Sequence, residues 1–300
     1  MRTSRLAAAL LALTAGAALL TGMAAPAVVP ASRPAVRFGE VRLATGVWIR
    51  YAEQGDPAGE PVILLHGLSD SWFSWSRVLP LFPSGWRVYA LDQRGHGDSD
   101  RPESGYTARD LAADVVAFLD AKGIGRATVV GHSMGGIVAQ HVAAIAPERL
   151  SRLVLVASAG GLREMNGALE FEQAVMALTD PVSTAFAREF QESTIHRPLP
   201  KEFVDRTVVE SLKLPARVWH TLTADMMASP PAEVPVTRFP VLMFWGTNDA
   251  VFSREAEDRL QARIPRGRLV VYPETGHAVH WERPEEFAAE LRDFMNARAR

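Results

Sequence analysis

Residues 128–136 read TVVGHSMGG, a short apolar run followed by a serine between glycines. Ser133 completes the pattern G-x-S-x-G with Gly131 and Gly135, and the helix-forming stretch GIVAQHVAAIAP follows. A chain that turns sharply from a strand into a helix strains the middle residue and lifts its side chain clear of the sheet. A Cβ two residues to either side would collide with that backbone, so glycine is needed there. We therefore interpret Ser133 as a nucleophile; the alternative is a structural turn that contains a serine.

Apolar runs and helical stretches alternate on both sides of this unit. Six runs rich in Val, Ile and Leu are predicted to be strands: 61–67, 86–97, 127–133, 152–158, 239–249 and 268–277. Residues 107–124 are a helical stretch whose apolar face holds Leu111, Val115, Phe118 and Leu119. Apolar strands separated by helices indicate an α/β fold, with a mostly parallel twisted sheet covered on both faces. The alternating pattern in 41–55 predicts antiparallel strands at the edge of this sheet.

The segment 162–234 interrupts the alternation. It has no clear strand but several amphipathic patches, and prolines punctuate its second half. We predict that it forms a helical cap inserted into a core made of residues 28–161 and 235–300.

The first 27 residues have the layout of a secretory signal peptide. Two arginines precede an apolar run over 6–23, and small residues follow, with cleavage predicted after Ala25 or Ala27. An uncleaved membrane anchor is the alternative, because the apolar run is long for a signal peptide. Glycine and alanine dilute its hydrophobicity and favour cleavage. We expect a secreted or extracytoplasmic protein with no integral membrane span after cleavage.

Composition excludes several classes of function. The chain has 300 residues, a formal net charge of −2 and no cysteine. The net charge does not indicate a surface that binds nucleic acid. The lack of cysteine excludes disulfides, thiolate nucleophiles and cysteine-bound zinc. The core must suffice for stability without disulfides. Oligomeric state is not indicated by any feature of the sequence.

A serine nucleophile needs a base, and the base needs a carboxylate to orient it. Asp249 ends FWGTND and His277 ends VVYPETGH, so each comes directly after a predicted strand. Carboxyl ends of parallel strands are where open α/β sheets place their sites, and the order Ser, Asp, His fits a strand–turn–helix serine. The alternative to Asp249 is a carboxylate after the predicted strand at 152–158. The residues at the end of that strand read VASAGG and include no Asp or Glu.

Two backbone N–H groups are candidates for stabilising an oxyanion. Met134 directly follows the nucleophile, and Leu68 follows the strand that ends at His66 and Gly67. Both are identified by position in the chain and not by side-chain chemistry. We interpret His66 as structural, and likewise the polar segment DQRGHGDSD at 92–100.

Taken in order, HGLSDSW, DQRGHGDS, GHSMGG, GTND and TGHAVHWERPEEF resemble the motifs of the α/β-hydrolase fold superfamily, in its serine esterase and lipase-like branch. The resemblance covers about residues 40–297, and 162–234 lies where this family carries its helical cap. It implies a Ser133–His277–Asp249 triad with Leu68 and Met134 as oxyanion donors. It implies hydrolysis of small-molecule or lipid carboxylic esters, with no metal or organic cofactor.

The resemblance also brings alternatives on the same fold. The spacing after His66-Gly67 resembles that of haloalkane dehalogenases and epoxide hydrolases. Those enzymes, however, use aspartate as the nucleophile where this chain has Ser133. The glycine-rich oxyanion loop of carbon–carbon bond hydrolases is absent. A perhydrolase or haloperoxidase-like enzyme, a lactonase, a carbon–carbon bond hydrolase and a non-catalytic binding protein remain as alternatives.

Overall fold

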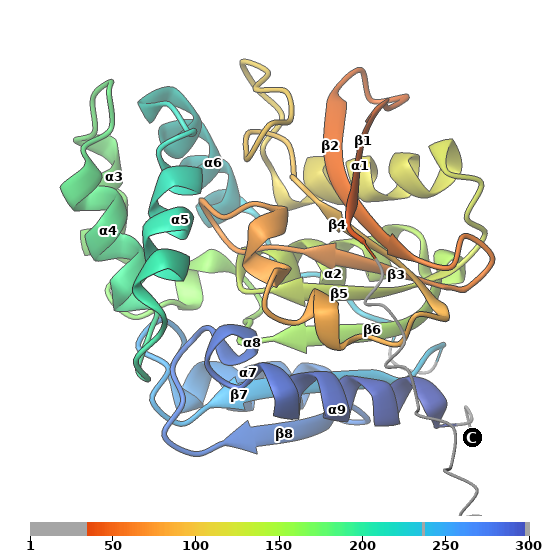
Figure 1. The fold of residues 1–300 in the computed structure, drawn as a ribbon. Helices are drawn as coiled ribbons and strands as arrows, with labels where there is room; N and C mark the ends of the chain where they lie inside the picture. The colour runs from red at the N-terminus through yellow and green to blue at the C-terminus, as the bar shows by residue number, and fades with distance from the viewer. Residues whose placement is uncertain (1–34, 236–237, 298–300) are drawn as a thin grey trace, which may run out of the picture. The chain divides into compact units, whose positions relative to one another are not determined.

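The computed structural model describes residues 35–235 and 238–297. The predicted leader, residues 1–27, lies outside the described residues. A central sheet has the strand order β1-β2-β4-β3-β5-β6-β7-β8 (Figure 1). Its strands are β1 (Arg37–Arg42), β2 (Trp48–Gly55), β3 (Glu60–Leu65), β4 (Trp86–Leu91), β5 (Ala127–His132), β6 (Leu150–Val156), β7 (Val241–Gly246) and β8 (Arg268–Tyr272).

The sheet is parallel from β4 to β8 and antiparallel at one edge. β1 pairs with β2, and β2 pairs with β4, in antiparallel register, whereas the remaining neighbours are parallel. The central strands β3 and β5 are apolar along most of their length because both faces of the sheet are covered. The predicted α/β fold and its antiparallel edge are confirmed.

Helices cover both faces of the sheet. They are α1 (Ala108–Ala121), α2 (Met134–Ile145), α7 (Arg254–Arg263), α8 (Val279–Glu282) and α9 (Pro284–Asn296). Side chains of α1, α2 and α7 share one apolar cluster with one face of the sheet. Side chains of α8 and α9, with those of two short 3-10 helices at Trp72–Trp75 and Leu79–Leu81, pack on the other face.

Sequence-local features set where α1 begins. The Thr107 side chain accepts from the Asp110 N–H, and the Asp110 carboxylate accepts from the Thr107 N–H, which is a capping box. The predicted apolar face of this helix, with Leu111, Val115 and Phe118, is buried against the sheet.

Four α-helices of the described residues lie between β6 and β7, in the segment predicted to be a cap. They are α3 (Ala168–Met176), α4 (Thr184–Ser193), α5 (Lys201–Ser211) and α6 (Ala216–Ala228). Figure 1 shows them grouped at the carboxyl ends of the parallel strands. The buried Val175, Trp219 and Met226 join the apolar cluster that contains α1 and α2. Within the described residues, no helix is both long enough and apolar enough to cross a membrane.

Candidate active site

Ser133 occupies a strained turn between β5 and α2. Its φ and ψ are 53° and −119°, values that L residues rarely adopt. A Cβ at Gly131 would lie 2.2 Å from the Gly135 carbonyl oxygen, and a Cβ at Gly135 would lie 2.3 Å from that of Leu65. Glycine is therefore required on both sides, as the sequence motif predicts.

His277 and Asp249 meet at the ends of neighbouring strands. Nδ1 of His277 lies 2.9 Å from one Asp249 carboxylate oxygen and 3.1 Å from the other. Asp249 Oδ1 also accepts the backbone N–H groups of Val251 and Phe252, at 2.8 and 2.9 Å. Because the carboxylate can only accept, a neutral imidazole in this position carries its proton on Nδ1 and its lone pair on Nε2.

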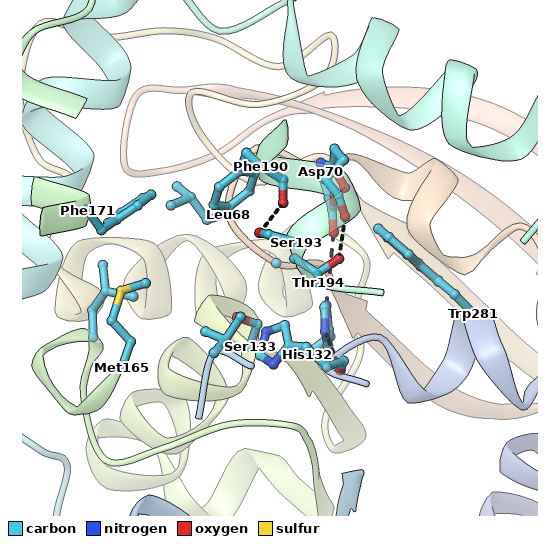
Figure 2. A pocket seen from close by; sticks show the side chains of 15 residues that line it. Leu68, Asp70, His132, Ser133, Met165, Phe171, Phe190, Ser193, Thr194 and Trp281 are labelled. Atoms are coloured by element: carbon cyan, nitrogen blue, oxygen red, sulfur yellow. Dashed lines mark hydrogen bonds and ion pairs between the residues drawn. The ribbon is translucent and has the colours of Figure 1, made fainter. Parts of the chain in front are cut away.

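Ser133 and His277 line the same pocket, which lies between the sheet and the cap. Its remaining lining residues are Gly67, Leu68, Asp70, His132, Leu162, Met165, Phe171, Phe190, Gln191, Ser193, Thr194, Val251 and Trp281. Figure 2 shows Met165 and Phe171 toward one end of this pocket and Trp281 toward the other, with Ser133 between them. The structure thus brings the predicted serine and histidine to one cavity, with Asp249 behind the histidine.

The two predicted oxyanion donors have free N–H groups. In the described chain, neither the Leu68 nor the Met134 N–H donates to another protein group. Met134 is the first residue of α2, where helix N–H groups lack an intrahelical acceptor and the helix dipole favours negative charge.

The Leu68 N–H is oriented by its own peptide group. The Gly67 carbonyl oxygen accepts from His66 Nδ1 at 2.7 Å and from the Asp70 N–H at 3.3 Å, which closes a turn over residues 67–70. The C=O and N–H of one planar peptide point in opposite directions. The N–H of Leu68 therefore points away from those two donors, and Leu68 lines the pocket.

Three buried polar residues that line the pocket have no role predicted from the sequence: Asp70, His132 and Gln191. Burial raises the pKa of Asp70 to about 6 and lowers the pKa of His132 well below its ordinary value. His132 Nδ1 lies 4.0 Å from an Asp70 oxygen and has no hydrogen-bond partner in the part of the chain that the structure describes. His132 lies beside Ser133 in the motif, which is a weak signal, whereas Gln191 lies in α4 with no motif around it.

The residues interpreted as structural do stabilise loops. His66 accepts the Gln93 N–H on Nε2 at 3.0 Å, and its own carbonyl oxygen accepts from the Gln93 side chain. Asp92, in DQRGHGDSD, accepts the N–H groups of Trp72 and Asp98 and so ties this segment to the loop after β3. His96 is buried outside the pocket. Among the described residues no cluster of His, Asp or Glu side chains has the geometry of a metal site.

A family model for the alpha/beta hydrolase family matches residues 62–290, which include the serine turn, the acid and the histidine. The chain belongs to this family. It is a hydrolase of the α/β-hydrolase type, as the order of its motifs predicts.

Relatives within the family cover almost the whole chain. The uncharacterized hydrolase YugF of Bacillus subtilis is 26% identical over 259 residues, which are 83% of this chain and 95% of that protein. The esterase RhEst1 from Rhodococcus sp. ECU1013 has a TM-score of 0.76 at 27% identity and covers 87% of this chain and 99% of its own. A hydrolase from Pseudomonas aeruginosa PA01 has a TM-score of 0.75 at 26% identity, with coverage of 87% and 99%.

Proposed function

We propose that the protein is a serine hydrolase that cleaves carboxylic esters through Ser133, His277 and Asp249. One observation carries the proposal. A serine held at φ 53° on a strand–helix turn shares a buried pocket with a histidine whose Nδ1 is bound by a carboxylate. Within the described residues, two backbone N–H groups have no protein acceptor: that of Met134, which follows the serine in the chain, and that of Leu68, which lines the pocket. This is the set of groups that acyl transfer needs.

The steps follow from these positions. His277 Nε2 accepts the Ser133 proton as the hydroxyl oxygen adds to the ester carbonyl, and the Leu68 and Met134 N–H groups stabilise the resulting oxyanion. The imidazolium returns the proton to the leaving alkoxide, and an acyl-enzyme remains on Ser133. Water, deprotonated by His277, adds to this ester, and the carboxylic acid leaves as the serine regains its proton.

The choice of nucleophile favours acyl transfer over epoxide opening. A carboxylate that opens an epoxide forms an ester, which water can cleave. A serine that opened an epoxide would form an ether, which the same site could not hydrolyse. Ser133 therefore suits substrates with a carbonyl carbon, and we expect esters in preference to epoxides.

The pocket walls favour an acyl chain of modest length. Leu162, Met165, Phe171 and Phe190 give the cap side an apolar lining, and the free space beside these side chains is small. We infer that the acyl group lies against these side chains.

We also propose export, from the signal-like pattern of residues 1–27. Mass measurement of the mature N-terminus of protein recovered from the medium would check this proposal.

The test is a series of p-nitrophenyl esters from acetyl to palmitoyl, with wild type and Ser133→Ala compared. We expect turnover that peaks at short to medium chains and falls by at least about 1,000-fold in the variant. The other hydroxyls that line the pocket, those of Ser193 and Thr194, donate to backbone carbonyl oxygens and are not expected to replace the nucleophile. Absence of turnover by wild type on every ester, or full activity of Ser133→Ala, would contradict the proposal.

A further inference from the structure

The turn that presents the Leu68 N–H is held by the cap. Ser69, the third residue of this turn, has φ 62°, and at that position type II turns normally need glycine or asparagine. A serine there is strained, and such strain persists only where the surroundings fix it. Ser69 is fully buried, so its fixing contacts must come from the protein itself.

Those contacts come from Gln191 in α4 and Ser211 at the end of α5. The Gln191 Nε2 donates to Ser211 Oγ at 2.8 Å, to Asp70 Oδ1 at 3.0 Å and to Ser69 Oγ at 3.2 Å. The Ser69 and Ser211 hydroxyl oxygens are 3.1 Å apart. One cap amide therefore contacts both Ser69 and Asp70, the two residues that close the turn.

The same end of α4 also holds the histidine loop. The carbonyl oxygen of Thr194, the residue after α4, accepts the backbone N–H of His277 at 3.0 Å and that of Ala278 at 3.3 Å. The cap thus contacts both halves of the site, the oxyanion turn through Gln191 and the base through Thr194. Figure 2 shows Thr194 and Asp70 among the residues that line the pocket.

We propose that Gln191 is a positioning residue of the oxyanion hole: it holds the 67–70 turn in the conformation that directs the Leu68 N–H into the pocket. This inference rests on the proposed ester hydrolysis and adds that the oxyanion hole is complete only with the cap in place. The Gln191 amide nitrogen is occupied by Ser69, Asp70 and Ser211, so it acts on the oxyanion hole through Ser69 and Asp70.

The test compares Gln191→Met, which keeps the length of the side chain without its N–H donors, with Gln173→Met at an exposed position of α3. We expect Gln191→Met to lower kcat by about 10- to 100-fold with KM within about threefold, because the interaction is realised in the transition state. Its inhibition constant for a trifluoromethyl ketone, which forms an oxyanion on Ser133, should rise by a similar factor. Gln173→Met should match wild type.

A second pair of variants isolates the backbone. Ser69→Ala keeps the strained φ and removes the hydroxyl, whereas Ser69→Gly adopts positive φ without help. We expect Ser69→Gly to retain the higher kcat. A merely structural role for the side chain would give the opposite order, because glycine removes more packing atoms.

The outcomes separate this inference from the proposed function. Turnover by wild type, combined with a normal kcat in Gln191→Met or with an unchanged trifluoromethyl ketone constant, would overturn the positioning role alone. A higher kcat in Ser69→Ala than in Ser69→Gly would do the same. Failure of wild type to hydrolyse any ester would overturn the proposed function, and the positioning role with it.

Discussion

Two serines with positive φ mark the two sides of the proposed oxyanion site. Ser133 has φ 53° and Ser69 has φ 62°. The strain at Ser133 is predictable from sequence because glycines must flank it at a distance of two residues. Ser69 has no such neighbours, and its conformation depends on Gln191, which is more than 100 residues away along the chain. Backbone strain that is held by a distant contact cannot be predicted from the residues next to it in the sequence.

The Asp249 carboxylate is expected to decide which nitrogen of His277 carries the proton. In Asp249→Asn, the amide oxygen would stay with the N–H groups of Val251 and Phe252, and the NH₂ would face Nδ1. The histidine proton then moves to Nε2, which can no longer accept from Ser133. We expect kcat to fall roughly 1,000- to 10,000-fold. Asp258→Asn, at an exposed position of α7, is the control, and near-normal turnover of Asp249→Asn would reassign the acid.

Asp70 should make stability depend on pH. Burial raises its pKa from 3.8 to about 6, so the native state binds this proton more tightly than the unfolded state. The resulting stabilisation of the native state is complete below about pH 4 and is lost as pH rises through about 6. The corresponding decrease in the free energy of unfolding is about 3 kcal/mol. The free energy of unfolding of wild type, minus that of Asp70→Asn, should therefore fall between pH 4 and 7. Urea unfolding measures it, and a difference independent of pH would contradict the assignment.

At the scale of elements, strand ends were predictable and cap contacts were not. Runs of Val, Ile and Leu placed β5, β7 and β8, and with them Ser133, Asp249 and His277, because parallel strands share one carboxyl edge. The helices between β6 and β7 were expected from amphipathic patches. Which helix residues face the pocket depends on how α3 and α4 pack over the core, and periodicity alone does not give that packing.

The apolar side chains of α3 should set chain-length preference. Phe171 lines the pocket, whereas Phe186 of α4 contacts Trp219 and does not line it. Phe171→Ala should raise kcat/KM for the octanoyl ester relative to the butyryl ester by about tenfold, because it opens the apolar end. Phe186→Ala removes the same side chain elsewhere and should leave this ratio unchanged. An unchanged ratio in Phe171→Ala would place the acyl chain at another wall.

On the scale of the whole molecule, cap and core share one apolar cluster. Val175, Trp219 and Met226 of the cap belong to the same cluster as Val115 of α1 and Ile137 of α2. We therefore expect cap and core to unfold in a single cooperative transition. Calorimetry and tryptophan fluorescence should give the same midpoint. A separate transition at lower temperature, with loss of activity, would show that the cap unfolds on its own.

The family and the edge of the sheet that bears the site followed from motif order, since each motif is local and tied to a strand end. The coupling between α4 and the active-site loops needed three-dimensional contacts, because Gln191, Asp70 and His277 belong to three distant segments. Local sequence motifs thus predict the proposed nucleophile, acid and base, whereas the contacts that hold them depend on the folded chain.

The most direct test of the central claim is covalent labelling of the serine. Native protein is treated with a fluorophosphonate, digested, and the modified peptide identified by mass, alongside protein denatured beforehand and the variant His277→Ala. We predict modification at Ser133 in the native wild type and much slower modification in both controls, because reactivity depends on the folded base. Labelling at another residue, or equal labelling of Ser133 in the denatured protein, would contradict the account.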